Sequence, residues 1–231
     1  TEWGDIPTER IESLRCGWPS YMQYGMNGEM IVAHTGGDQG LVMNYRETRG
    51  TGDWTEIFFQ GPEGHEDIIW PRVVTSGADY MTIHVFGVTT PVANGGSLYQ
   101  GMDGCVVYSR STDGGTTWVD DNITLDGMGP DYYTMAGGDY YAIANPVGDN
   151  IAFVMASKWQ DMYLMKSEDN GATWEKTMIW EHPYPFFDWN VTVTDTFFCP
   201  DGAVAVAIDN DGIAHVTFGI TRVGHFEIGD T

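Results

Sequence analysis

Two aspartates in the 231-residue sequence stand beside tryptophans in a way that suits carbohydrate chemistry. Asp67 and Asp188 each come just before a predicted strand, close to Trp70 and Trp189. Hydrolysis of a glycosidic bond needs two carboxylates flanking the sugar, and an aromatic face stacks well on a sugar ring. We therefore take the two aspartates as candidate catalytic groups and the two tryptophans as candidate ligand-binding groups. The competing interpretation places the aspartates on an acidic surface and the tryptophans in a core.

Arg72, two residues after Trp70, is the candidate catalytic cation of the same site. Arginine binds a carboxylate through two parallel hydrogen bonds, so it suits recognition of an acidic sugar. An arginine at a strand end in so acidic a protein also pairs readily with a surface carboxylate, and this second interpretation stays open.

Three histidines, His34, His84 and His215, occupy similar positions in three apolar segments, and a ring of imidazoles can bind a metal ion. Equivalent positions of a repeat are held apart by the repeat itself, which favours histidines hydrogen-bonded within their own strands. Residues 209–212 resemble the start of a calcium loop but lack its closing glutamate, so we expect a β-turn there. The sequence predicts no metal site and no cofactor, with calcium left open as the cation of an acidic protein.

Composition excludes several classes of partner. The chain has 33 acidic and 10 basic residues and a formal net charge of −23, which repels nucleic acid and anionic lipid. No apolar run approaches the roughly 20 residues of a membrane-spanning helix, so we expect no membrane insertion. The chain begins at Thr1 without a signal peptide, which suggests a processed or excised segment. High acidity suits a salty or calcium-containing medium, and we expect an extracellular or cell-surface location.

The three cysteines, Cys16, Cys105 and Cys199, show no metal-binding spacing. Three buried thiols are favoured, and one disulfide with one free thiol is the alternative.

Two segments of the chain superimpose without a gap. Residues 108–118 and 164–174 share a pattern of Ser, Asp, Gly, Thr and Trp at fixed spacing. A degenerate copy at 45–54 keeps the turn glycines and the terminal Trp. The shared positions are Ser111, Asp113, Gly115, Thr117 and Trp118, matched by Ser167, Asp169, Gly171, Thr173 and Trp174.

Physical chemistry explains why these residue types recur. A short Ser or Asp side chain accepts hydrogen bonds from turn amides that have lost their ladder partners. Glycine supplies the positive φ that a tight hairpin requires, Thr suits the returning strand, and Trp buries a large ring. We therefore predict a structural role for the ten shared residues.

Apolar strands lie upstream of each hairpin, and together they divide the chain into four units. The units span roughly 18–60, 70–127, 131–183 and 189–231, and the last stops before any hairpin Asp or outer strand. No linker or low-complexity tract separates them. We predict an all-β fold in one domain, residues 1–231, or a fragment of such a domain.

The pattern Ser-x-Asp-x-Gly-x-Thr-Trp resembles the Asp box, also called the bacterial neuraminidase repeat. This resemblance implies a β-propeller of the sialidase-like superfamily, with each box turning between the third and fourth strands of a blade. About four four-stranded blade units are recognisable, and a complete ring of the family would have six or seven blades. Boxes of this family lie at the rim, away from the central mouth where ligands bind.

The sequence departs from a sialidase, since it lacks the Phe/Tyr-Arg-Ile-Pro motif and an evident arginine cluster. We therefore expect a secreted or cell-surface recognition module that binds glycans or a protein partner. The alternatives are a sialidase-like glycoside hydrolase and a structural subunit of a surface assembly. Other chain segments that complete the propeller are a further expected partner.

Overall fold

The computed structural model describes residues 9–228 and contains four antiparallel sheets. Sheets I to III have four strands each, and sheet IV has two. Sheet I holds β1 (Gly17–Tyr24), β2 (Gly28–His34), β3 (Leu41–Arg46) and β4 (Thr55–Phe59). Sheet II holds β5 (Ile68–Ser76), β6 (Thr82–Thr89), β7 (Val106–Ser111) and β8 (Asp120–Ile123). Sheet III holds β9 (Tyr141–Ile143), β10 (Ile151–Ser157), β11 (Gln160–Ser167) and β12 (Glu175–Trp180), and sheet IV holds β13 (Phe197–Ile208) and β14 (Ala214–Val223).

In every sheet the spatial order of the strands follows the chain. Each strand pairs antiparallel with the next, as in a β-propeller blade. The fold is therefore the all-β propeller expected from the sequence, and residues 9–228 supply two strands of its fourth blade. A single turn of 3₁₀ helix, η1 (Val92–Asn94), interrupts the connection between β6 and β7. No helix in residues 9–228 is long and apolar enough to cross a membrane.

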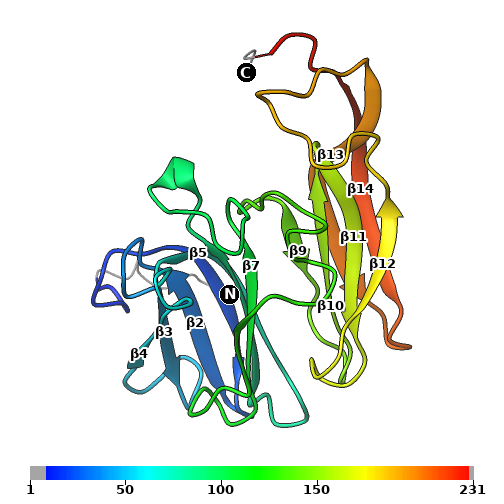
Figure 1. Ribbon diagram of the computed structural model, residues 1–231. Helices are drawn as coiled ribbons and strands as arrows, with labels where there is room; N and C mark the ends of the chain where they lie inside the picture. Colours follow the sequence, from blue (N-terminus) through cyan, green and yellow to red (C-terminus); the bar gives the residue numbers. More distant parts are fainter. Residues whose placement is uncertain (1–8, 229–231) are drawn as a thin grey trace.

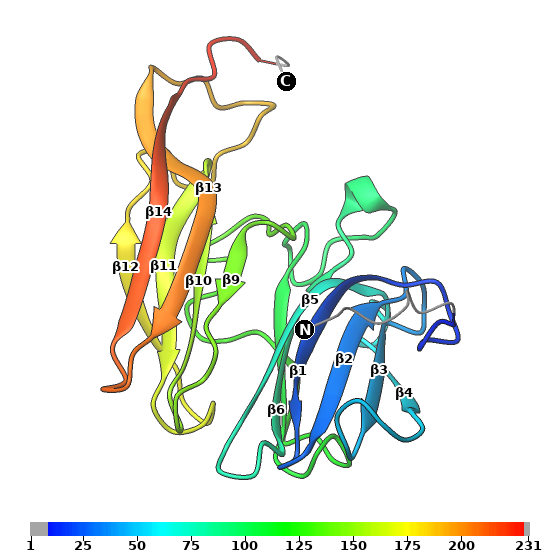
Figure 2. The same ribbon diagram turned by 180° about the vertical axis from the view of Figure 1, so that it is seen from behind.

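The four sheets follow one another along an open arc. Strand β1 of sheet I packs against β5 of sheet II, and β10 of sheet III packs against β13 of sheet IV. Figures 1 and 2 show sheets I and IV on opposite sides of the molecule. Within residues 9–228 the two ends of this arc do not meet.

Aromatic rings fill the space between neighbouring sheets. Phe86 of β6 and Phe153 of β10 lie with ring centroids 4.7 Å apart and are both fully buried. Strands β6 and β10 are buried on both faces because each has a sheet on either side. Strand β14 instead alternates between half-buried and exposed residues, since one face of sheet IV lacks a covering sheet within the described part of the chain.

The hairpin between β7 and β8 has the hydrogen bonds that the sequence pattern predicts. The Oγ of Ser111 accepts the Gly115 N–H at 2.8 Å, and Asp113 Oδ1 accepts the Thr117 N–H at 2.8 Å. Gly115 has a φ of 90°. The hydrogen bonds from Thr117 and Ser111 lower the pKa of Asp113 to about 2.

The hairpin between β11 and β12 repeats this arrangement. Ser167 Oγ accepts the Gly171 N–H at 2.8 Å, and Asp169 Oδ1 accepts the Thr173 N–H at 2.8 Å. The Thr173 side chain and backbone lower the pKa of Asp169 to about 2. Gly171 again has a positive φ, 80°. Both aspartates are therefore used within their own turns.

The tryptophan that ends each hairpin packs on the preceding sheet. Trp118 of sheet II lies 4.4 Å from the ring of Phe59 in sheet I. The ring of Trp174 in sheet III packs edge-on against two rings of sheet II, with centroid distances of 5.3 Å to Tyr108 and 5.8 Å to Phe86. The hairpins thus join neighbouring sheets as well as turning the chain.

Cys16, Cys105 and Cys199 are free thiols in the structure. Cys105 and Cys199 are buried and Cys16 is half-buried. Burial raises the pKa of Cys105 to about 11, which keeps that thiol protonated and unreactive.

Candidate functional site

The connections of the sheets divide into two ends. Figure 1 shows η1 and the loop before β13 at the upper end of the ribbon, and the β7–β8 and β11–β12 hairpins at the lower end. We call the upper end the loop end. Irregular loops held on a rigid sheet scaffold are the usual place for binding residues, so the search for a site starts there.

A hollow of 320 Å³ opens between sheets III and IV at the loop end. Four separate connections line it: the segment before β9, the β10–β11 turn, the loop before β13 and a bulge in β13. We call it the aromatic pocket and define it by Asp139, Tyr140, Lys158, Trp159, Trp189 and Asp201.

The two tryptophans of the aromatic pocket are held by other rings. Trp159 and Trp189 have centroids 4.6 Å apart with planes inclined at 66°. Trp159 also stacks on Phe187 at 4.2 Å, and Trp189 meets the edge of His225 at 5.1 Å. Trp189 remains 38% exposed. The indoles therefore form a fixed apolar wall that a ligand can reach.

Two carboxylates and one ammonium group surround this wall. Asp139 and Lys158 are exposed and Asp201 is half-buried. One carboxylate oxygen of Asp201 accepts the Ala203 N–H at 2.8 Å, which fixes the side chain in the β13 bulge. The pocket therefore offers acceptors and one donor next to aromatic faces, a combination that suits a polyhydroxylated ligand.

Of the residues predicted from the sequence, Trp189 lies in the aromatic pocket and Asp188 holds its own turn. The Oδ1 atom of Asp188 accepts hydrogen bonds from the N–H and Nδ2 of Asn190, at 2.8 and 2.9 Å. The backbone N–H of Asp188 donates to the Thr192 hydroxyl at 3.1 Å. Asp188 thus stabilises its own turn, whereas the next residue, Trp189, lines the pocket.

Asp67 lies in another hollow of the loop end, between sheets I and II. The Thr90 hydroxyl donates to Asp67 Oδ2 at 3.0 Å and to the Asp67 carbonyl at 2.7 Å. Asp38 and Glu66 line the same hollow, whose volume is 290 Å³. No group of three or more His, Cys, Asp or Glu side chains is placed to hold a metal ion within residues 9–228. Calcium binding stays a prediction.

Trp70 occupies a bulge of β5 next to sheet I. Its φ is +51°, a left-handed conformation shared with Trp18, and both tryptophans precede a proline. The N–H of Trp70 donates to Nδ1 of His34 at 2.9 Å. Burial lowers the pKa of His34, and Asp67 opposes that shift in part. The indole of Trp70 also packs on the core shared by sheets I to III.

Arg72 links sheet II to the segment before β9. Its Nη2 donates to the Gly138 carbonyl at 3.0 Å, and its guanidinium lies 5.2 Å from the centre of the Tyr141 ring. These contacts occupy the guanidinium with protein groups. Asp67 directly precedes β5 and Trp70 and Arg72 belong to that strand, whereas Asp188 and Trp189 lie in the loop before β13, at a different sheet.

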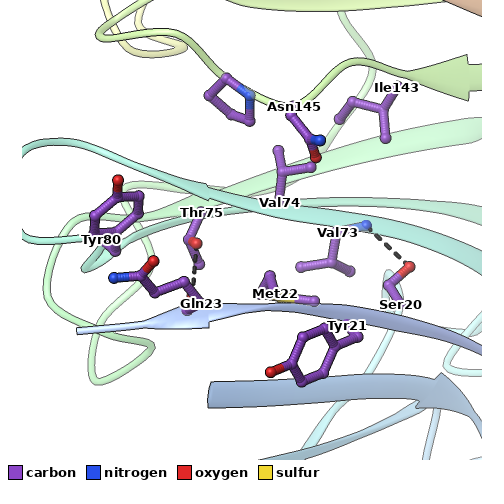
Figure 3. A pocket seen from close by; sticks show the side chains of 11 residues that line it. Ser20, Tyr21, Met22, Gln23, Val73, Val74, Thr75, Tyr80, Ile143 and Asn145 are labelled. Carbon is purple, nitrogen blue, oxygen red and sulfur yellow. Dashed lines mark hydrogen bonds between the residues drawn. The ribbon is translucent and has the colours of Figure 1, made fainter. Parts of the chain in front are cut away.

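The first strands of sheets I, II and III line a third hollow of 390 Å³, the axial groove (Figure 3). The Val73 N–H donates to Ser20 Oγ at 3.3 Å, and the Thr75 hydroxyl donates to the Gln23 carbonyl at 2.7 Å. None of the 11 residues that line it carries a charge. The groove thus lacks the carboxylate pair or arginine cluster that glycoside hydrolysis at the axis would need.

Sequence reasoning missed Asp139, Tyr140, Lys158, Trp159 and Asp201. Asp201 had a local signal, since Pro200-Asp201-Gly202 interrupts an apolar strand as a bulge does. The other four come from turns whose meeting point depends on how sheet IV packs on sheet III. We know of no pattern in the sequence that would have brought them together.

No family model and no curated protein matches the chain. Among solved structures it is similar to the catalytic domain of a GH62 α-L-arabinofuranosidase from Coprinopsis cinerea (TM-score 0.45, 11% identity), covering 95% of this chain and 70% of that one. It is also similar to the K499G mutant of NanB sialidase from Streptococcus pneumoniae, with a TM-score of 0.42 and 14% identity. That match covers 77% of this chain and 23% of the sialidase chain. The sialidase of Trypanosoma rangeli matches with a TM-score of 0.43 and 11% identity. That match covers 70% of this chain and 30% of the sialidase chain. The chain spans less than a third of either sialidase, and at these TM-scores the likeness says nothing about activity.

Proposed function

We propose that this protein is a glycan-recognition module and that the aromatic pocket is its binding site. The observation that carries the proposal is the pair of indoles of Trp159 and Trp189, fixed 4.6 Å apart beside carboxylates in a hollow of 320 Å³. A sugar ring has apolar C–H faces and a rim of hydroxyl groups. Aromatic walls match the faces, and carboxylates accept hydrogen bonds from the hydroxyls.

The charges of the pocket favour a neutral or amino sugar over an acidic one. Asp139 and Asp201 outnumber Lys158, and the whole chain carries a net charge of −23. An anionic glycan would meet repulsion at long range and find one ammonium group in the pocket. We therefore infer that sialylated and sulfated glycans bind more weakly than neutral ones.

Binding without hydrolysis is the better supported form of this function. The axial groove is uncharged, and Arg72 and Asp188 already make hydrogen bonds to the protein itself. We further propose that the two self-satisfied hairpins are Asp boxes with a structural role and that the protein acts outside the cell. Its acidity supports this location, because high net charge keeps a protein soluble in a salty medium.

A glycan array probed with the intact chain tests the proposal, followed by calorimetric titration of the best ligand. We expect a neutral or amino-sugar ligand, and Trp189→Ala should weaken its binding by roughly tenfold or more, as truncation of an aromatic anchor does. Asp139→Asn should weaken binding without loss of stability, because its side chain is exposed. Trp54→Ala is the matched control, since Trp54 packs on Arg46 outside the pocket.

Three results would contradict the proposal. The first would be a glycan array with no specific ligand. The second would be a loss of binding in Trp54→Ala as large as that in Trp189→Ala. Release of product from a panel of fluorogenic glycosides, lost in Asp139→Asn, would make the pocket catalytic rather than a binding site.

A further inference from the structure

We propose that the aromatic pocket selects a sugar that carries a protonated amino group, and that Asp201 is the residue that selects it. This inference rests on the proposed function and names the chemical class of its ligand. The pocket combines two indole rings with two carboxylates and one ammonium group, which leaves it a net formal charge of −1. A neutral sugar uses the indoles, whereas a sugar with one positive charge uses the indoles and balances the charge.

Asp201 keeps one carboxylate oxygen available for a ligand. Its Oδ1 accepts the Ala203 N–H, whereas its Oδ2 receives neither a hydrogen bond nor an ion pair from residues 9–228. The residue is half-buried, and a carboxylate oxygen that is partly removed from water gains most from a charged donor. An ammonium group on the sugar is such a donor. A hydroxyl or an N-acetyl group offers a neutral one.

Gly219 of β14 leaves the room that this carboxylate occupies. A Cβ on Gly219 would lie 2.0 Å from Asp201 Oδ2 and 2.7 Å from its Cγ, closer than non-bonded atoms approach. Gly219 lies opposite the bulge of β13, between the pairs that Pro200 and Val204 form with β14. The bulge thus brings the Asp201 side chain over a position that has no side chain of its own. Gly219 is therefore a positioning residue for Asp201.

The aromatic walls of the pocket also favour an ammonium group over a neutral substituent. A cation close to the face of an indole is attracted by the electrons of the ring, and Trp189 is exposed enough for a ligand to reach it. The chain already holds one of its own ammonium groups in this way, since Nζ of Lys176 lies 4.4–4.7 Å from the centres of three tyrosine rings. Indoles next to carboxylates thus suit an organic cation.

The other charges around the pocket leave Asp201 free for this role. Lys158 is exposed and forms no ion pair within residues 9–228, so its ammonium group does not occupy the Asp201 carboxylate. Asp139 adds a second carboxylate at the exposed side of the pocket. The net charge of −23 attracts a cationic ligand at long range as well.

Sugars that differ only in the substituent at C2 test the proposal by calorimetric titration at about pH 6, where amino groups are protonated. The probes are glucosamine, galactosamine and mannosamine, each with its N-acetyl form and with its hydroxyl counterpart. At least one amino sugar should bind roughly tenfold or more tightly than both of its counterparts, because it adds a charge-assisted hydrogen bond.

The outcomes separate this inference from the proposed function. If no amino sugar binds more tightly than its counterparts, the inference is overturned, and glycan recognition stands wherever a hydroxyl or N-acetyl form binds through Trp189. If no sugar of the panel binds, both are overturned. Cyclohexylamine has an amine and a ring without hydroxyl groups and should bind more weakly than the amino sugar. Equal binding of cyclohexylamine would contradict recognition of a sugar.

Asp201→Asn tests the selecting residue directly. The amide oxygen can still accept the Ala203 N–H, so the variant removes the charge and keeps the turn. Its affinity for the amino sugar should fall roughly tenfold or more, and its affinity for the hydroxyl counterpart should fall much less. Asp53→Asn makes the same change of net charge at an exposed position of sheet I and is the matched control. Equal losses in the two variants would contradict a role for Asp201.

Gly219→Ala tests the position of the carboxylate without changing any charge. The added methyl group displaces Asp201 Oδ2, so this variant should also lose the preference for the amino sugar. Gly37→Ala is the matched control, because a Cβ there meets nothing within 4 Å and the backbone is not left-handed. A folded Gly219→Ala that keeps the full preference would overturn the positioning role. If Gly219→Ala unfolds by circular dichroism, Asp201→Asn decides.

Discussion

Stability between pH 7 and pH 5 should depend on one buried histidine, His84 of β6. Its side chain is fully buried, with Nε2 2.7 Å from Ser76 Oγ and Nδ1 2.8 Å from the Tyr108 hydroxyl. The Ser76 hydroxyl in turn donates to Asn170 of the β11–β12 hairpin. The imidazole thus lies in a polar network that joins sheets II and III.

Burial lowers the pKa of His84 to about 3, and the nearby Arg110 acts in the same direction. In the unfolded chain a histidine titrates near 6.5. Between these two values the unfolded state binds a proton that the folded state refuses, so stability rises with pH and falls as the solution is acidified. Each unit below 6.5 costs about 1.4 kcal/mol, and lowering the pH from 7 to 5 therefore costs about 2 kcal/mol.

Urea denaturation of the native chain and of His84→Gln at pH 7 and pH 5 measures this contribution. The variant should be less stable at pH 7, because its amide replaces the imidazole imperfectly, and its loss between the two pH values should be smaller by about 2 kcal/mol. Asp113 and Asp169 do not interfere, since their folded pKa of about 2 and unfolded pKa near 3.8 place their effect at lower pH.

The lowered pKa of His34 acts with the same sign as that of His84, so the comparison between proteins isolates His84. His215→Gln, which removes an exposed histidine paired with Asp209, is the comparison variant and should change the stability at pH 7 by about 1 kcal/mol or less. The reasoning fails if His84→Gln loses as much stability on acidification as the native chain does.

Two further substitutions test contacts of sheet III. Ser167→Ala removes the acceptor of the buried Gly171 N–H and should cost about 1–3 kcal/mol in urea denaturation, whereas Thr116→Ala, at an exposed position, should cost much less. Lys176→Met removes the ammonium group that lies 4.4–4.7 Å from the centres of three tyrosine rings and should cost about 1–2 kcal/mol, with a changed near-ultraviolet dichroism. A cost for Thr116→Ala equal to that of Ser167→Ala, or an unchanged spectrum for Lys176→Met, would contradict these assignments.

The fold class could be predicted because its signals are local. Ser111 and Asp113 satisfy amides of their own turn, so their spacing identifies the hairpin without knowledge of the rest of the chain. Alternating apolar strands then require sheets on both sides, and β10 shows that burial. These two signals predict hairpins and sandwiched strands, and the propeller was what the resemblance of the hairpin pattern to the Asp box implied.

The candidate site depended on contacts between distant segments, which sequence spacing does not encode. Arg72 has a carbonyl and an aromatic ring as partners because the segment before β9 returns to sheet II, a path set by the packing of whole sheets. Asp139 and Trp159 likewise approach Asp201 only where sheet IV packs on sheet III. The strand expected directly after Asp188 begins only at Phe197, so the reason for choosing Trp189 was wrong although Trp189 lines the pocket.

The two ends of the molecule show why the repeated residues are poor candidates for function. Asp113 accepts hydrogen bonds from Thr117 and Ser111, and its low pKa reflects that its charge is already stabilised within the turn. Asp139 and Trp189 belong to neither repeat of the sequence, and both are exposed in the aromatic pocket. A residue that recurs in successive blades serves a structural requirement that those blades share, here the hydrogen bonding of amides in the hairpin turn. Binding of a ligand at one place instead requires side chains that differ from blade to blade. The pocket between sheets III and IV is built from such groups, and we therefore expect specificity to change with the loops before β9 and β13 while the hairpins stay the same.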